Sequence, residues 1–412
     1  MMSHKQTIIP SCASSLRLGA ALGVLAWVSA CGPSQNSSNT TPVAQGNAAV
    51  NSAALAPVVV RPPEVTNGQP ANTIINSTAG ADFAAGAAEA SLPAAGQAID
   101  QSQLQPAAAP APSRPAAALP YDPTLVKAEV LLDRAGFSPG VIDGRDGENF
   151  QHALGAFAAS RGLASTGALD PSTWNALTGG DGAPAVQTYV ITAADEAGPF
   201  IGAPPKTYPA MAKLGALSYS GPEQALAERF HIDQKLLEAL NPGADYSKTG
   251  QVLLVVSPRP GPRDIDVSRI EVDKTNEVLR AYGPDGKLVA FYPASVGSTE
   301  RPAPSGVFAV ASVAPHPAYY YDPARLTFTA AGAKGNLRIA PGPNNPVGLT
   351  WIALTIPTYG IHGSPDPTTI GKHQSHGCVR LTNWDAVELG KAVKKGVQVD
   401  FVGQDKAPGA KT

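Results

Sequence analysis

Apolar side chains recur every three or four positions between residues 121 and 180. This spacing predicts two helices, whose apolar positions are Leu125, Ala128 and Leu132, and then Phe150, Leu154, Phe157 and Ala158. A third helix is expected to begin at Asp170, because an aspartate cap followed by proline at the first helical position is a typical start. Trp174 and Leu177 would share its inner face. We therefore predict a small three-helix domain over residues 121–180.

Residues 186–258 combine strand and helix patterns. Residues 188–191 and 252–256 are predicted strands, and apolar residues at helical spacing predict two helices between them. The second helix should end at Asn241-Pro242-Gly243. We therefore expect an α+β unit, in which residues 196–222 form an unusually long first connection.

From residue 265 to residue 403, short β-rich runs separated by turn signals predict an all-β, sandwich-like domain. The runs cover residues 269–272, 278–282, 288–296, 306–313, 337–340 and 351–356. A helix should follow, capped by Thr382 or Asn383 and stopped by Gly396. Its inward-facing residues should be Trp384 and Val387. The chain as a whole is expected to be multidomain.

Residues 1–30 have the pattern of an export signal. Positive charge precedes an apolar run over residues 18–28, which is too short to span a bilayer. The run ends in a segment that resembles a lipobox, in which Cys31 would carry the lipid; an ordinary signal peptide with a chance cysteine is the alternative. Because Gly32 is not aspartate, a lipoprotein of a Gram-negative bacterium would be sorted to the periplasmic face of the outer membrane. We therefore expect a periplasmic protein held to that membrane by a lipid anchor.

Composition adds a tether and excludes one class of partner. The 412 residues include 40 Pro and 41 Gly, and residues 31–120 have almost no aromatic side chains. Such a segment cannot bury enough apolar surface to fold, so we predict a disordered tether, and likewise a disordered tail over residues 404–412. A net charge of −2 gives no electrostatic reason to bind nucleic acid.

The chain has three cysteines: Cys12, Cys31 and Cys378. If the first is cleaved away and the second lipidated, Cys378 is left unpaired, which marks it as a candidate reactive thiol. It lies between His376 and Arg380, a setting expected to stabilise a thiolate. A histidine could act as its base, and two are close in sequence. His362 would face the cysteine if residues 359–362 form a strand, and His376, two residues before Cys378, would point to the same side in an extended segment.

The neighbouring residues suit acyl transfer. Gly377 would let the backbone approach a substrate, and the N–H groups of Gly377 and Cys378 are candidate oxyanion donors. Arg380 could hold a carboxylate. Two alternatives remain open: a buried inert thiol, and a zinc site, although the spacing of its ligands matches no usual pairing. The zinc ligands would be His362, His373, His376 and Cys378.

Residues 265–402 resemble an L,D-transpeptidase catalytic domain of the YkuD type. The resemblance is carried in order by residues 304–308, 342–348, 359–364 and 375–381. It implies that Cys378 is the nucleophile, that His362 is the base and that Gly363 orients His362 through a backbone oxygen. The other implied site residues are His376 and Arg380, which shape the acyl-binding site, and Ser375, which supports the loop.

The resemblance also implies substrates and partners. Cys378 would attack a peptidoglycan tetrapeptide stem at the bond between its diamino acid and D-Ala, form a thioester and pass the acyl group to an amine. That amine could belong to another stem, giving a 3→3 cross-link, to a lysine of an outer-membrane lipoprotein or to a free D-amino acid. No cofactor would be needed, and carbapenems would acylate the cysteine.

The accessory units resemble wall-binding modules. The three-helix domain resembles a peptidoglycan-binding domain, and the second unit resembles a LysM glycan-binding module that departs from the pattern in its long connection. Two other functions stay open: an L,D-carboxypeptidase, in which water resolves the thioester, and a non-enzymatic lipoprotein that tethers the membrane to the wall.

Overall fold

The computed structural model describes residues 92–104, 120–297, 302–324, 331–372 and 377–405. The predicted export signal and most of the predicted C-terminal tail lie outside these residues, as do Cys31, Ser375 and His376. Within the described parts of the chain, none of the helices has the length and apolar character needed to cross a membrane.

Helix α2 (Ala94–Asp100) lies inside the segment predicted to be a disordered tether, and for these residues that prediction is wrong. Ile99 is fully buried among apolar residues of the two accessory units. The Asp100 carboxylate accepts from the backbone of Ala185 at 2.7 Å, and Lys127 donates to the Asp100 carbonyl at 2.6 Å. Composition alone missed the helix because its anchoring partners lie far along the chain.

Three helices form the first unit: α3 (Pro123–Ala135), α4 (Glu148–Ser160) and α5 (Pro171–Gly180). Helix α5 begins as predicted, with the Asp170 carboxylate accepting from the backbone of Ser172 and Thr173. The apolar core of this unit includes Phe291 and Val278 of the later β-rich domain. The three helices therefore pack directly on that domain.

The second unit has its two strands at its ends. They are β1 (Val186–Val190) and β2 (Val252–Val256), which pair antiparallel with Val186 opposite Val256. Between them lie α6 (Ala193–Ala197), α7 (Tyr208–Met211), α8 (Pro222–Arg229) and α9 (Gln234–Leu240). Helix α9 ends before Asn241 as predicted, and the Asn241 side chain exchanges hydrogen bonds with the backbone of Leu254.

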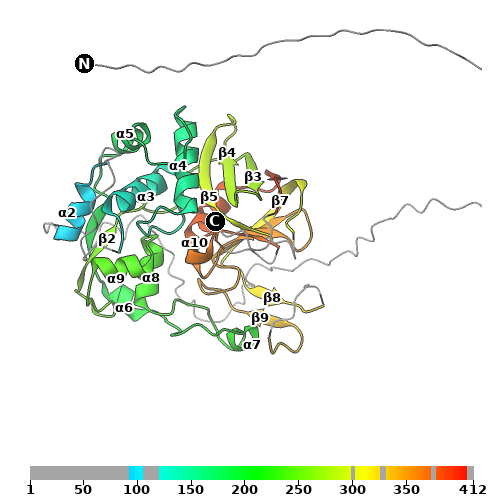
Figure 1. The fold of residues 1–412 in the computed structure, drawn as a ribbon. Helices are drawn as coiled ribbons and strands as arrows, with labels where there is room; N and C mark the ends of the chain where they lie inside the picture. The colour runs from blue at the N-terminus through cyan, green and yellow to red at the C-terminus, as the bar shows by residue number, and fades with distance from the viewer. Residues whose placement is uncertain (1–91, 105–119, 298–301, 325–330, 373–376, 406–412) are drawn as a thin grey trace, which may run out of the picture. The chain divides into compact units, whose positions relative to one another are not determined.

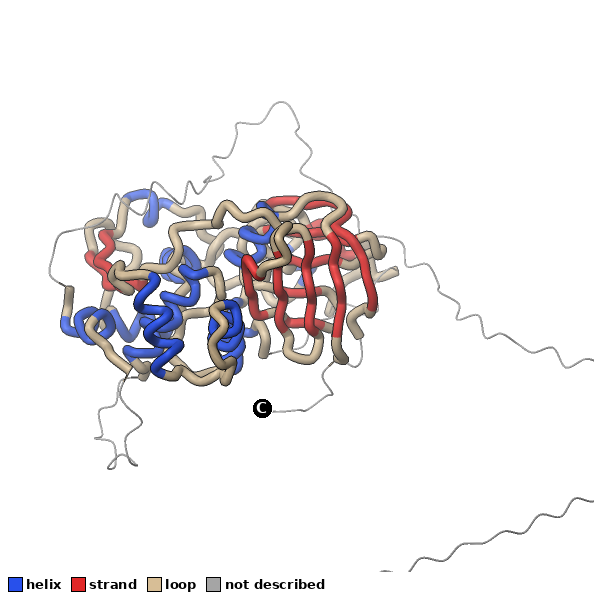
Figure 2. The backbone as a smooth tube through the Cα atoms, turned by 90° about the horizontal axis from the view of Figure 1, so that it is seen from above, coloured by secondary structure: helices blue, strands red, loops and turns tan. Residues whose placement is uncertain are grey.

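A nine-stranded sheet forms the third unit, in the order β5-β4-β3-β13-β7-β10-β11-β12-β6 (Figures 1 and 2). Its strands are β3 (Arg269–Asp273), β4 (Val278–Tyr282), β5 (Leu288–Pro293), β6 (Ser295–Val296), β7 (Gly306–Pro315), β10 (Thr350–Leu354), β11 (Gly360–His362), β12 (Val379–Arg380) and β13 (Gln398–Val402). A separate hairpin is formed by β8 (Tyr319–Tyr321) and β9 (Leu337–Ile339), and a short 3-10 turn covers Pro367–Thr369.

Strand β7 gives the sheet its sandwich-like form. Its first part, from Gly306 to Ala309, pairs with β13, whereas its second part, from Val310 to Pro315, pairs with β10. The two halves of the sheet can therefore diverge, and their apolar faces share one core, which contains Ile270 from one half and Ile361 from the other. The predicted β-rich fold class is confirmed.

Helix α10 (Asn383–Ala392) lies between β12 and β13 in the chain, and its buried face differs from the prediction. Thr382 caps it, but Trp384 and Val387 are only half-buried, whereas Asp385 and Glu388 are fully buried. The helix ends at Ala392, not at Gly396. The carboxylates can be buried because two arginines neutralise them: Arg259 contacts Asp385 at 2.8 Å and Glu388 at 3.1 Å, and Arg263 contacts Glu388 at 2.7 Å.

Candidate active site

Cys378 is half-buried and lies directly before β12, which pairs in parallel with β11. The register sets Ile361 opposite Val379 and His362 opposite Arg380. Because side chains alternate along a strand, Cys378, Arg380 and His362 project from the same face of this pair. The sheet therefore sets the candidate base on the strand next to the one that the candidate nucleophile directly precedes.

His362 ends β11, as expected, and its ring is held from two sides. Its Nδ1 lies 2.7 Å from the carbonyl oxygen of Gly363, and this contact requires the proton on Nδ1. Trp351 stacks on the ring with centroids 5.4 Å apart. Nε2 is thereby left as the basic nitrogen. The backbone contact is the one that the family resemblance implies for Gly363, and its part in catalysis stays a prediction.

Both reacting groups are neutral in this site. Burial raises the pKa of the Cys378 thiol to about 11, and a backbone hydrogen bond from Gly360 and the charge of Arg380 only partly oppose it. Burial also lowers the pKa of His362 to about 4. The resting thiolate expected from the sequence is therefore not favoured, because removal from water outweighs the nearby cation. A neutral imidazole on β11 can still accept the proton of a neutral thiol during attack.

The turn before Cys378 is held by an aromatic side chain. The Tyr359 hydroxyl donates to the carbonyl of Gly377. Gly377 has φ +122, a backbone conformation that favours glycine. Sequence reasoning gave no role to Tyr359 or Trp351, although their aromatic character next to β10 and β11 was the available signal.

The described residues contain no group of three or more His, Cys, Asp and Glu side chains placed to hold a metal ion. Two of the four candidate zinc ligands, His373 and His376, lie outside the described residues. Ser375 and Cys31 also lie outside them.

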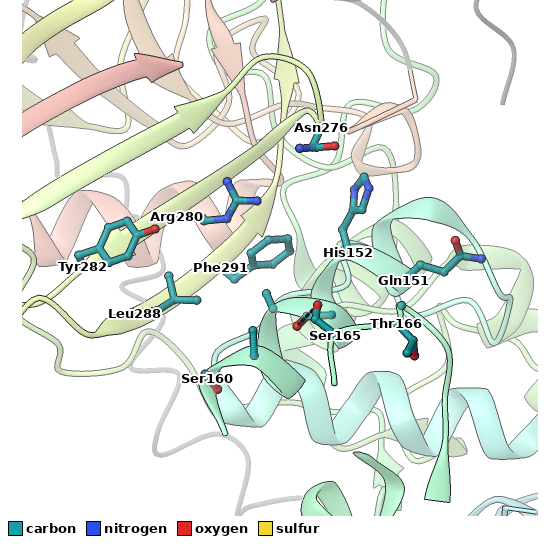
Figure 3. Close-up of a pocket in the computed structure, with 14 residues that line it drawn as sticks. Gln151, His152, Ser160, Ser165, Thr166, Asn276, Arg280, Tyr282, Leu288 and Phe291 are labelled. Carbon is teal, nitrogen blue, oxygen red and sulfur yellow. Dashed lines mark hydrogen bonds between the residues drawn. The ribbon is translucent and has the colours of Figure 1, made fainter. Parts of the chain in front are cut away.

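A concave region lies between α4 and the edge of the large sheet, and its lining does not include Cys378 (Figure 3). It is a groove of about 640 Å³. The small residues Gly155 and Ala159 of α4 line it, and so does Phe291 of β5. Its other labelled lining residues are mostly polar: Gln151, His152, Ser160, Ser165, Thr166, Asn276, Arg280, Tyr282 and Leu288. The groove has the mixed polar and aromatic lining of a binding surface.

Two family models match this chain. One, described as "L,D-transpeptidase catalytic domain", matches residues 268–400, and the other, described as "Putative peptidoglycan binding domain", matches residues 122–177. The first range covers the nine-stranded sheet with Cys378 and His362, and the second covers most of the three-helix unit.

Several known proteins are similar to this chain. "Putative L,D-transpeptidase YkuD" of Bacillus licheniformis is 30% identical over 182 residues, which are 43% of this chain and 92% of that protein. "Probable L,D-transpeptidase ErfK/SrfK" of Escherichia coli is 32% identical over 173 residues, which are 41% of this chain and 55% of that protein. A crystal structure of an L,D-transpeptidase from Xylanimonas cellulosilytica is 19% identical and covers 70% of this chain and 100% of that chain, with a TM-score of 0.29.

Proposed function

The chain belongs to the L,D-transpeptidase family. We propose that it acts on peptidoglycan with Cys378 as nucleophile and His362 as base. The donor is a tetrapeptide stem whose third residue is a diamino acid such as meso-diaminopimelate. The observation that carries the proposal is the parallel pairing of β11 with β12, together with the fixing of the His362 ring by the carbonyl of Gly363.

The reaction has two steps. The Cys378 sulfur attacks the carbonyl carbon of the third stem residue while its proton passes to Nε2 of His362. The bond to D-Ala then breaks, the proton moves to the leaving amine and a thioester remains. Because both groups begin neutral, proton transfer accompanies attack and does not precede it. The N–H groups of Gly377 and Cys378 are the proposed oxyanion donors, and Arg380 with His376 would shape the acyl-binding site.

An amine resolves the thioester in the second step, with His362 as its base. A second stem would give a 3→3 cross-link in cell wall biogenesis, and a lipoprotein lysine would give an anchored outer-membrane protein. Water as acceptor would make the protein an L,D-carboxypeptidase. A non-enzymatic wall tether is the remaining alternative. The register of β11 and β12, which sets His362 opposite Arg380 two residues after Cys378, argues for chemistry instead.

Mass spectrometry of the purified protein mixed with disaccharide-tetrapeptide tests the proposal, with Cys378→Ala as control. A dimer joined through two diamino acids, absent from the control, is the expected product. Formation of disaccharide-tripeptide without a dimer would indicate that water resolves the thioester and that the protein is an L,D-carboxypeptidase. No product from either protein, together with failure of Cys378 to take up a carbapenem, would overturn the enzymatic proposal.

Binding to the wall and to the membrane forms the second part of the proposal. The groove of Figure 3 supports wall binding by the three-helix unit, because amide and hydroxyl side chains such as Gln151 and Thr166 suit the hydroxyl and N-acetyl groups of a glycan. Lipidation of Cys31 would hold the protein at the periplasmic face of the outer membrane. Cys31→Ala should release it into the soluble periplasmic fraction, and retention in the membrane fraction would contradict the anchor.

A further inference from the structure

Residues 198–221, the long connection within the second unit, are fixed to the catalytic domain. Leu217 is fully buried; its N–H donates to the carbonyl of Pro341 and its carbonyl accepts from Asn344, both at 2.9 Å. The Asn344 side chain also donates to the carbonyl of Ser218 at 2.7 Å. The connection is thus joined by three hydrogen bonds to the loop that follows β9.

Gly342 allows this close approach. Its φ is +144, and a Cβ at this position would lie 2.2 Å from the carbonyl oxygen of Leu217. Any side chain at position 342 would separate the two segments.

Helix α7 is part of the same connection, and its first residue enters the aromatic cluster of the β8–β9 hairpin. Figure 1 shows α7 beside β9. The Tyr208 ring meets Tyr319 and Tyr321 edge-on, with centroids 5.5 and 5.4 Å apart. The side chains of Tyr208 and Tyr319 are also hydrogen-bonded to each other.

This aromatic cluster reaches the reacting groups. Tyr319, Tyr321 and Trp351, which stacks on His362, are buried in one apolar cluster, against which Cys378 packs. Burial raises the pKa of Tyr208 and the charge of Arg380 opposes the rise, so the two side chains are electrostatic neighbours. Tyr208 therefore packs directly on the hairpin and lies within electrostatic range of the cation of the site.

We propose that residues 198–221 form one wall of the acyl-donor pocket and that Tyr208 is a positioning residue for the stem peptide. Tyr208 holds Tyr319 beside Cys378, and together with Arg380 it directs a hydroxyl and a cation towards peptide carbonyl and carboxylate groups. The unit that resembles a glycan-binding module thus contributes to the choice of acyl donor. This inference rests on the proposed function.

The test compares Tyr208→Phe with Tyr246→Phe. Each variant removes one hydroxyl from a tyrosine of the second unit, but Tyr246 is partly buried against the core of that unit and does not pack on the hairpin. The measurement is KM and kcat for D-Ala release from disaccharide-tetrapeptide. We expect Tyr208→Phe to raise the donor KM about three- to tenfold with little change in kcat, as the loss of one hydrogen bond predicts, and Tyr246→Phe to leave both unchanged. An unchanged KM for Tyr208→Phe would overturn the positioning role.

A second measurement does not depend on turnover. Tyr208→Leu removes the edge-on packing, so iodoacetamide should alkylate Cys378 severalfold faster than in the wild type. If the folded Tyr208→Leu variant were alkylated at the same rate as the wild type, the proposal that residues 198–221 form a wall of the pocket would be overturned. If the wild type released no D-Ala, the proposed function would fail, and the alkylation rates would still decide whether residues 198–221 cover the cysteine. If Tyr208→Leu does not fold, the donor KM of Tyr208→Phe decides the proposal, because that variant keeps the aromatic ring and its packing.

Discussion

Asn383 donates from its side-chain amide to both carboxylate oxygens of Glu228, each at 3.2 Å. Asn383 begins α10 of the catalytic domain, whereas Glu228 belongs to α8 of the second unit. The Asn383 Oδ1 accepts from the backbone of Leu349 at 3.0 Å, and a Cβ on Gly363 would lie 2.3 Å from that same oxygen. One asparagine therefore ties the second unit to the turn that orients His362.

Glu228→Gln should remove a pH dependence of stability. Burial raises the pKa of Glu228 from 4.5 to about 7, against hydrogen bonds from Asn383 and Tyr219. The folded protein holds this proton more tightly than the unfolded chain, so the stabilisation is complete below the unfolded pKa and is lost as the pH rises towards 7. Relative to the variant, the wild type should lose roughly 2–3 kcal/mol of unfolding free energy between pH 5 and pH 7 in urea titrations. Parallel pH profiles for the two proteins would contradict the shifted pKa.

The alkylation rate of Cys378 should rise with pH and reach no plateau below about pH 9, because the thiolate reacts much faster than the thiol and burial raises the pKa of this thiol to about 11. Iodoacetamide labelling followed by mass spectrometry measures the rate, and Cys378→Ala gives the background. A plateau near pH 7 would instead indicate a resting thiolate–imidazolium pair.

His362→Ala should slow both iodoacetamide alkylation at neutral pH and acylation by a carbapenem. The loss of a general base costs about 10²- to 10⁴-fold in rate. Intact-mass measurements over time follow the carbapenem adduct, and Cys378→Ala should form none while keeping its fold. If the His362 variant reacted as fast as the wild type with both reagents, His362 would have no role as base.

Features of the structure that depend on local residue patterns could be predicted from the sequence. Strand β4 covers the predicted residues, Asp170 caps α5, and His362 ends a strand as required for it to face Cys378. Strands β8, β12 and β13 were missed, and β12 is only two residues long, too short to show an alternation of polar and apolar residues.

Other features could not be predicted because they depend on contacts between residues far apart in the sequence. The buried face of α10 could not be predicted from its own residues, because Asp385 is paired with Arg259, which lies 126 residues away. Likewise, nothing in the sequence around Tyr208 indicates that it packs on Tyr319. The ionisation of Cys378 was misjudged because charged neighbours are visible in a sequence, whereas burial is not.

Arg259→Met should destabilise the protein strongly. Arg259 is buried and contacts three carboxylates: Asp133 at 2.8 Å, Asp385 at 2.8 Å and Glu388 at 3.1 Å. Removing the shared cation leaves buried negative charges facing one another, which costs about 3–5 kcal/mol of unfolding free energy. Denaturant titration measures the loss.

The matched control is Arg269→Met. Arg269 is about one-third exposed and pairs with Glu271 and Asp400 at 3.4 Å, so its loss should cost about 1 kcal/mol or less. Equal losses in the two arginine variants would show that the buried network contributes no more than a surface pair.

Ala159→Trp should weaken binding to the wall without disturbing the chemistry. Ala159 is an exposed residue of α4 and lines the groove between the three-helix unit and the sheet, so an indole there would fill space that a glycan needs. Ala164→Trp is the control, because it adds the same side chain at an exposed position outside the groove lining. In co-sedimentation with purified peptidoglycan, we expect Ala159→Trp to bind about tenfold more weakly than the control, a change of about 1.4 kcal/mol. Carbapenem uptake by Cys378 should be equal in both, because the groove does not include the β11–β12 pair. Equal sedimentation of the two variants would exclude the groove as the wall-binding surface.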